Sequence, residues 1–302
     1  NIVWATYYGG NYLEEGHSTS VDKSGNVFLV GDTYSPTGIA STTGLQTILK
    51  GFKDAFIVKF NDAGQRQWAT YYGGNGYETG LSSATDKNNN IYVFGSTNST
   101  SGISTAGAHQ ATFSGINDAY LLKLNSNGQR QWATYYGGSK DETGYSCAID
   151  TIGNIYISGK TSSTNKMVTA SGAQTTFGGN VDAFLAKFNT NGVRQWGTYY
   201  GGTGVDYGYG CSVESNGTVY MTGTTASSNA IATVGSFQIA RKGASDGFLV
   251  KFNTSGVRQW ATYIGGDSTE DGLGTCVDIN GNVFVSGITE SASNIASEIG
   301  RA

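Results

Sequence analysis

The stretch R-Q-W-A-T-Y-Y-G-G at residues 66–74 decides the fold, because the chain repeats it. It returns unchanged at residues 130–138 and with a single substitution at 194–202 and at 258–266, and its W-A-T-Y-Y-G-G part also stands at 4–10. The tryptophans follow one another at a constant step of 64 residues, at Trp4, Trp68, Trp132, Trp196 and Trp260. A fixed period of this size, with no insertion or deletion, indicates a repeat architecture.

Composition narrows the class of protein. Charged residues make up only 13% of the 302 residues, whereas Gly (46) and Tyr (19) are abundant. This profile fits short strands joined by glycine-rich turns and excludes a helical bundle, which needs far more Glu, Lys, Leu and Ala. The net charge is −4 and the basic residues are spread evenly, so we expect no nucleic-acid partner. No apolar run is long enough to span a bilayer.

One unit of the repeat reads as four strands. In the second unit they are predicted at residues 80–86, 90–96, 118–125 and 129–136. Asp, Asn and Gly between the first and second strands, and between the third and fourth, predict two tight turns. The other two connections are long and, in an antiparallel meander, share the opposite end of the strands. Four antiparallel strands in each repeat are the blade of a β-propeller.

The sequence therefore predicts an all-β propeller of four-stranded antiparallel blades in a single domain, residues 1–302. The small residues of each first strand suit a crowded inner place, and the Trp of each fourth strand is expected to pack between neighbouring blades. Residues 1–10 are predicted to be an outer strand that closes the last blade. We expect a fragment of a larger propeller, and a closed five-bladed ring with one incomplete blade is the alternative. The predicted blades are at about 11–74, 75–138, 139–202 and 203–266, with a partial blade at 267–302.

A three-part motif recurs in every unit. It reads D-x-x-G-N-[VI]-[YF]-[VIL]-x-G, then D-A-[FY]-[LI]-x-K-[FL]-N-x-x-G, then W-x-T-Y-Y-G-G, with departures at Glu214, Thr218, Gly247 and Ile264. In this the chain resembles the seven-bladed β-propeller (SBBP) repeat family. The resemblance implies a large secreted or surface protein of bacteria or archaea, which in Bacteroidetes-like bacteria is often exported by type IX secretion. It implies no particular reaction, because propellers host many.

An acidic residue stands two positions before a glycine at the start of each predicted first strand. One interpretation is a cation site near the long-loop end, with calcium as the expected ion because calcium takes several oxygen ligands. The other is that each carboxylate accepts hydrogen bonds from its own turn or pairs with a neighbouring cation, since a ring of unpaired like charges repels itself. The residues are Glu14, Glu78, Glu142, Asp206 and Glu270.

Other repeated charges are predicted to be structural pairs. Asp54 and Lys59 stand five residues apart in the third strand, and both recur in the next three units. Identical repetition in every blade favours pairing within the scaffold over a functional site.

Two loop patches differ among the units and carry the candidate ligand-binding residues. In the first unit they are residues 11–13, before the first strand, and residues 50–53, before the third. Loops on a rigid scaffold are the usual place for recognition, and aromatic rings there stack on sugars or apolar groups. Neutral variation at exposed tips is the alternative. The candidates are Tyr12, Phe52, Tyr77, Lys140, Asp141 and Tyr207.

The chain is not predicted to be an enzyme. A catalytic site needs asymmetric residues that converge from different blades, and few are left once the repeated positions are removed. The two histidines, His17 and His109, occupy non-equivalent positions, so no zinc site is expected. We therefore expect no cofactor other than calcium.

Three functions stay open. The leading one is a secreted or cell-surface scaffold whose long-loop face binds an extracellular glycan or protein, with secretion-system or surface-assembly proteins as further partners. The second is a structural or adhesive spacer of a large surface protein or appendage. The third is the non-catalytic part of a secreted enzyme.

Overall fold

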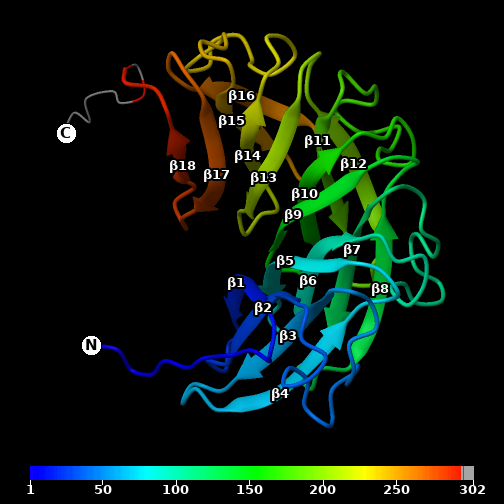
Figure 1. The fold of residues 1–302 in the computed structure, drawn as a ribbon. Helices are drawn as coiled ribbons and strands as arrows, with labels where there is room; N and C mark the ends of the chain where they lie inside the picture. The colour runs from blue at the N-terminus through cyan, green and yellow to red at the C-terminus, as the bar shows by residue number, and fades with distance from the viewer. Residues whose placement is uncertain (294, 296–302) are drawn as a thin grey trace. The chain divides into compact units, whose positions relative to one another are not determined.

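A computed structural model describes residues 1–293 and 295, and within this range the regular secondary structure consists of β-strands (Figure 1). The described residues include no helix that is long and apolar enough to cross a membrane. The strands form sheets in chain order, as the repeat predicts, and each four-stranded sheet falls inside one predicted blade. The prediction of an all-β propeller made of four-stranded blades is confirmed.

The strand bounds follow the repeat. The first sheet contains β1 (Glu14–Val21), β2 (Val27–Thr33), β3 (Asp54–Phe60) and β4 (Arg66–Tyr72). The second contains β5 (Glu78–Thr85), β6 (Ile91–Thr97), β7 (Asp118–Leu124) and β8 (Arg130–Tyr136). The third contains β9 (Glu142–Ile149), β10 (Ile155–Thr161), β11 (Asp182–Phe188) and β12 (Arg194–Tyr200). The fourth contains β13 (Asp206–Val213), β14 (Val219–Thr225), β15 (Asp246–Phe252) and β16 (Arg258–Ile264), and β17 (Glu270–Val277) pairs with β18 (Val283–Thr289).

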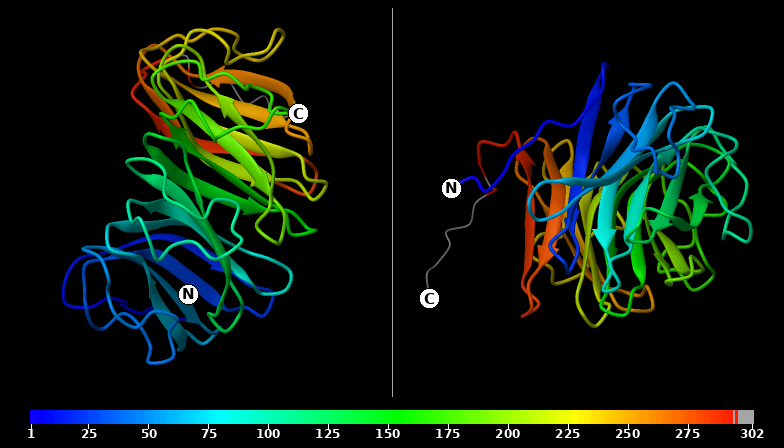
Figure 2. Two further views of the ribbon diagram at one scale, coloured as in Figure 1. Left: turned by 90° about the vertical axis from the view of Figure 1, so that its right-hand side faces the viewer. Right: turned by 90° about the horizontal axis from the view of Figure 1, so that it is seen from below.

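The chain divides into two compact units. The first comprises Asn1–Ile155 and Phe188–Arg194, and the second comprises Tyr156–Lys187 and the residues from Gln195 onward. In the first unit β5 lies across β1, β2 and β3, and β9 lies across β5, β6 and β7 (Figures 1 and 2). In the second unit β17 lies across β13, β14 and β15. The first strand of a blade therefore covers the sheet that precedes it.

The small residues of the first strands are needed for this close packing. A Cβ on Gly80 of β5 would lie 2.5 Å from Cγ1 of Val30 in the preceding sheet. In the second unit, a Cβ on Gly272 of β17 would lie 2.4 Å from Oγ1 of Thr222. Since real Cβ atoms do not approach other atoms so closely, a larger residue at either position would push the sheets apart.

The tryptophans join neighbouring blades. The indole Nε1 of Trp68 donates a hydrogen bond at 3.0 Å to the carbonyl oxygen of Ser126, in the β7–β8 turn of the next blade. Phe28 of the same blade packs against the Trp68 ring, with 6.0 Å between the ring centroids. The predicted inter-blade role is confirmed for Trp4, Trp68, Trp132 and Trp196. The same indole bond joins Trp4 to Asp62, Trp132 to Thr190 and Trp196 to Thr254.

Asp54 and Lys59 make structural contacts within the scaffold, but not with each other. Lys59 Nζ lies 3.8 Å from a carboxylate oxygen of Asp22 and donates to the carbonyl oxygen of Ser126 at 3.1 Å. Asp54 instead accepts hydrogen bonds from the backbone amides of Lys50 and Gly51, at 3.0 and 3.1 Å. The reason is the strand direction: Asp54 begins β3 at its long-loop end, whereas Lys59 lies near the tight turns at the other end.

Residues 1–10 have no strand assignment, yet they make the contacts of a fourth strand. Trp4 reaches the β3–β4 turn of the first blade, as described above. The hydroxyl of Tyr8 donates to the carbonyl oxygen of Ile39 at 2.8 Å, and Tyr72 makes the equivalent bond to Ile103. The side chains of this segment therefore contact the first blade in the same way as those of β4 contact the second.

Candidate functional site

Each blade junction brings the two variable loop patches together. Lys53, at the end of the long loop of the first blade, forms a parallel bridge with Tyr77, just before β5. The backbone N–H of Glu78 donates to the carbonyl of Lys53 at 2.8 Å, and that of Phe52 donates to the carbonyl of Gly76 at 3.1 Å. The residues that differ among the units therefore lie side by side. The same bridge recurs between Asn117 and Asp141, Val181 and Val205, and Ser245 and Thr269.

Phe52 and Tyr77 form an exposed aromatic pair at the first of these junctions. Their ring centroids lie 5.5 Å apart with an interplanar angle of 17°, so the rings are stacked. The two side chains are 69% and 45% exposed. Lys53, between them in the fold, has its Nζ 3.4 Å from a carboxylate oxygen of Asp32 and 5.7 Å from the ring centre of Tyr34. The pair therefore exposes two aromatic rings on either side of Lys53.

The other four candidate ligand-binding residues do not belong to the junction that contains Phe52 and Tyr77. Tyr12 is 67% exposed in the loop before β1. Lys140 and Asp141 belong to the next junction, where Asp141 accepts a hydrogen bond at 2.7 Å from the side chain of Asn117. Tyr207 is half-buried on β13 in the second unit. The ligand-binding role of all six residues stays a prediction.

The acidic residues predicted as a cation site accept hydrogen bonds from the scaffold, as Glu78 does from hydroxyls of its own blade and from the glycine that ends the preceding phrase. Glu78 Oε1 accepts hydrogen bonds from the hydroxyls of Thr97 and Ser99, both at 2.6 Å, and Oε2 accepts from the backbone N–H of Gly74 at 2.8 Å. This is the second of the two interpretations drawn from the sequence, and calcium binding by these residues stays a prediction. The glycine N–H bond recurs at 2.8–2.9 Å from Gly10 to Glu14, Gly138 to Glu142, Gly202 to Asp206 and Gly266 to Glu270.

Burial raises the pKa of two of these carboxyl groups, whereas the burial of Glu270 is outweighed by hydrogen bonds from Ser291, Gly266 and Thr289, which lower its pKa. Burial raises the pKa of Glu78, although hydrogen bonds from Ser99, Thr97 and Gly74 act in the opposite direction. Burial also raises the pKa of Asp206, in the same position of the fourth blade. In Glu78 and Asp206 the ionised form loses hydration that the hydrogen bonds replace only in part.

The paired glycines of the repeated phrase fit against these acids. The backbone N–H of Gly73 donates to Oε1 of Gln46 at 3.1 Å. A Cβ on Gly73 would lie 2.4 Å from Asp54 Oδ1 and 2.5 Å from Glu78 Oε2, and one on Gly74 would lie 2.2 Å from the Ser101 carbonyl oxygen. Both positions require glycine, because no side chain fits between the acids and the loop.

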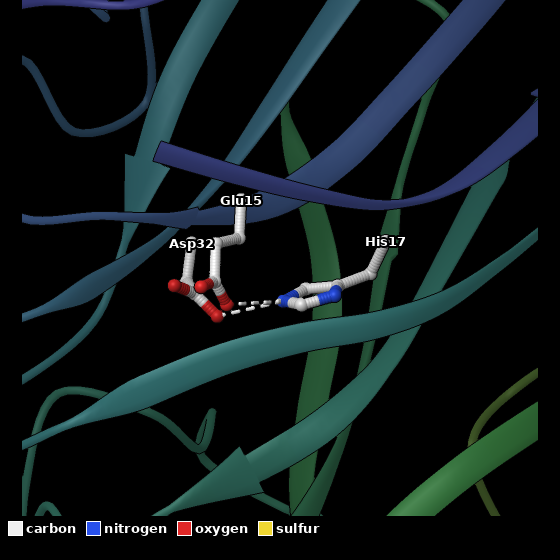
Figure 3. Close-up of side chains that lie close together, drawn as sticks. All are labelled: Glu15, His17 and Asp32. Atoms are coloured by element: carbon white, nitrogen blue, oxygen red, sulfur yellow. Dashed lines mark hydrogen bonds and ion pairs between the residues drawn. The ribbon is translucent and has the colours of Figure 1, made fainter. Parts of the chain in front are cut away.

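One cluster of metal-ligating residue types was missed by the sequence reasoning. Glu15, His17 and Asp32 each offer a ligand atom, and these atoms all lie within 4.8 Å of one another, which no other such group does in the part of the chain that the structure describes. His17 Nε2 lies 2.9 Å from Asp32 Oδ2 and 3.9 Å from Glu15 Oε2 (Figure 3). The available signal was difference between units: 64 residues on, these positions hold Thr79, Leu81 and Ser96.

The sequence is similar to segments of two longer proteins. It is 23% identical over 355 residues to an uncharacterized WD repeat-containing protein L264 of Acanthamoeba polyphaga mimivirus, covering 95% of this chain and 25% of that protein. It is 25% identical over 196 residues to the regulatory protein FlaEY of Caulobacter vibrioides, covering 62% of this chain and 20% of that protein. The chain thus spans a quarter or less of the length of the relatives that it matches.

Solved structures of low sequence identity are also similar. A gluconolactonase from Xanthomonas campestris is 10% identical with a TM-score of 0.43, over 93% of this chain and 71% of the enzyme. A protein of unknown function from Dyadobacter fermentans is 11% identical with a TM-score of 0.48, over 93% of this chain and 77% of that one.

The repeats themselves match a family model. The model is that of the beta-propeller repeat, SBBP, and it matches residues 67–102 and 131–165. Both matches begin in the repeated phrase and run through the first two strands of the following blade. Together with the four-stranded sheets, they show that the chain carries beta-propeller repeats of the SBBP family.

Proposed function

We propose that this chain is a non-catalytic scaffold of a secreted or cell-surface protein that binds a glycan through the loops at its blade junctions. The observation that carries the proposal is the stacked, exposed pair of Phe52 and Tyr77. Covering an exposed aromatic ring removes apolar surface from water, which is favourable in free energy. The flat faces of such rings also match the C–H faces of sugar rings.

The surroundings of the pair favour a glycan over a protein partner. Monomer surfaces that bind proteins usually present a contiguous apolar patch of several hundred square ångströms. Here the exposed apolar surface is two rings, and they flank Lys53, whose ammonium group is a hydrogen-bond donor. A small stacking surface with a few polar groups is the usual make-up of a carbohydrate site.

The repeat supports the scaffold part of the proposal. The backbone bridge between the loops is the same at all four described junctions, whereas the side chains on it change. A rigid frame with variable loop residues is how binding surfaces are commonly built. One junction differs from the others in having two stacked aromatic rings, and this difference is what gives the chain a preferred ligand.

A glycan array with the intact chain tests the proposal. We expect binding to a subset of glycans, and loss of at least about tenfold in affinity for Phe52→Ala and for Tyr77→Ala, since one stacking contact contributes about 1.4 kcal/mol. Phe237→Ala is the matched control, because Phe237 is 79% exposed but lies in another loop. Phe52 and Tyr77 are exposed, so the Tm of either variant should stay near that of the unchanged chain.

Two outcomes would end the proposal. One is an array with no bound glycan at micromolar protein. The other is glycan binding that is equally strong in Phe52→Ala, Tyr77→Ala and Phe237→Ala, which would place the contact elsewhere on the chain.

A further inference from the structure

We propose that Glu15, His17 and Asp32 form a binding site for a divalent transition-metal ion of the zinc type. The proposal does not depend on glycan binding. Figure 3 shows the imidazole of His17 facing the carboxylates of Glu15 and Asp32. An imidazole nitrogen together with two carboxylates is a donor set that suits zinc and its first-row neighbours, whereas calcium prefers oxygen ligands alone.

The distances fit a common ion. Zinc holds nitrogen and oxygen ligands at about 2.0–2.2 Å, so two ligand atoms of one tetrahedral site lie about 3.3 Å apart. The separations of His17 Nε2 from Asp32 Oδ2 and from Glu15 Oε2 are 2.9 and 3.9 Å, on either side of this value. The third separation, between the carboxylates of Glu15 and Asp32, is within 4.8 Å, so modest side-chain rotations would bring the three atoms to ligand geometry.

A β-bulge places the histidine. Glu15 on β1 stands directly opposite Asp32 on β2, and the pairing shifts between Gly16 and Ser18, which leaves His17 without a partner residue. A bulge of this kind redirects a side chain and is common beside functional sites. The second blade has the same shift between Gly80 and Ser82, so the bulge belongs to the scaffold and the histidine is particular to the first blade.

Access and charge also suit a cation. Glu15 and His17 are open to solvent, whereas Asp32 is buried, so an ion can enter from one side and meet a fixed carboxylate. Lys53 Nζ lies 3.4 Å from Asp32 Oδ2, the oxygen that also faces His17, so an ion bound there must displace this ammonium group or share the carboxylate with it. The ammonium group offsets one of the two carboxylate charges. With the imidazole neutral, as ligation requires, one net negative charge is left to attract a divalent ion.

The other blades supply substitutions that the scaffold already accepts. Sixty-four residues on, the three positions are Thr79, Leu81 and Ser96, so the variants Glu15→Thr, His17→Leu and Asp32→Ser copy the second blade. His109→Ala is the matched control, because it removes the other histidine and copies Ala173 of the third unit.

The test is metal binding by the intact chain after removal of adventitious ions with a chelating resin. Zn²⁺ alone is titrated by calorimetry, and Co²⁺ alone by visible absorption, which reports nitrogen and carboxylate ligation of the ion. We expect one ion bound per chain, a loss of at least about a hundredfold in affinity for His17→Leu, at least about tenfold for Asp32→Ser and Glu15→Thr, and no change for His109→Ala.

Several results would overturn the site. They are no Zn²⁺ heat and no Co²⁺ absorption with the unchanged chain, equal affinity in the unchanged chain and His17→Leu, or displacement of Zn²⁺ by an equal concentration of Ca²⁺. A far-ultraviolet spectrum and an unfolding curve of metal-free His17→Leu that match those of the unchanged chain ensure that a loss of binding reports the ligand and not the fold.

Discussion

The indole ring of Trp68 lies directly on Gly128, the positive-φ residue of the β7–β8 turn in the next blade. A Cβ on Gly128 would lie 3.0 Å from Cδ2 of the indole, and the residue has a φ of 77°. The same glycine therefore meets two demands, a left-handed backbone and a flat surface for the ring. The arrangement recurs with Trp4 on Gly64, Trp132 on Gly192 and Trp196 on Gly256.

Replacement of Gly128 by Ala should destabilise the protein by about 2–4 kcal/mol, because a left-handed alanine and an overpacked ring each cost about 1–2 kcal/mol. Gly107→Ala separates the two effects. Gly107 has a φ of 76°, but a Cβ there would meet nothing within 4 Å, so only the backbone cost of about 1 kcal/mol is expected. Denaturant unfolding of both variants is the measurement. Equal losses would mean that the indole yields to the new methyl group.

Isosteric substitution of Glu78 tests how the repeated acids work. Glu78→Ala should cost about 3 kcal/mol, because the N–H of Gly74 and two hydroxyls lose their acceptor. Glu78→Gln should cost much less, since the amide oxygen still accepts from Gly74 and the hydroxyls can turn to accept from the amide nitrogen. Thermal unfolding in calcium and in a calcium chelator completes the test. A calcium-dependent increase in Tm that both variants abolish would favour the metal interpretation instead.

Asp182 should make stability depend on pH. Burial, together with the nearby Asp206 carboxylate, raises the pKa of Asp182 from 3.8 to about 6. Between these two pH values the folded protein holds a proton that the unfolded chain releases, so the contribution of this carboxyl to stability falls as pH rises from about 4 to about 6.

The amide variant Asp182→Asn should therefore gain stability relative to the unchanged chain, by about 1–2 kcal/mol, when the comparison moves from pH 4.5 to pH 7.5. Asp246→Asn is the control, because both oxygens of Asp246 accept backbone hydrogen bonds, from Lys242 and Gly243. It should be destabilised at both pH values. An Asp182→Asn effect that does not change with pH would contradict the assigned pKa.

Replacement of Ala230 by glycine should stabilise the protein. Its φ is 65°, whereas Gly38 and Gly102, at the same place in the first two blades, have a φ of 88°. Ala230→Gly should stabilise the protein by about 0.5–1 kcal/mol, since the relief of the left-handed alanine exceeds the extra chain entropy of glycine. Gly38→Ala should lose a similar amount or more, because its Cβ would lie 3.1 Å from the Cα of Gly10. Denaturant unfolding measures both changes. A less stable Ala230→Gly or a more stable Gly38→Ala would contradict this explanation.

Structural features that come from repeated residues could be predicted from the sequence. Contacts between side chains that come together from separate strands could not. Identity of Trp68 with its copies indicates a junction role, and Asn89 takes the positive φ of 60° expected where the other turns have glycine. The partner of Lys59 was missed because its acceptor lies 67 residues downstream on another blade. The His17 cluster was missed because the difference between units marks its positions as unusual but does not bring them together; their closeness depends on the β1–β2 register and on a bulge.

The junction contacts have a consequence for how such chains change in length. Lys59 and Trp68 of one blade converge on a single carbonyl of the next, and Lys123 and Trp132 repeat this on Thr190. Because the partners are a main-chain oxygen and a glycine, neither surface is tailored to one particular neighbour. Deletion or duplication of a 64-residue segment by unequal recombination would therefore rejoin surfaces that already fit, so these blades are interchangeable modules that can be gained or lost one at a time.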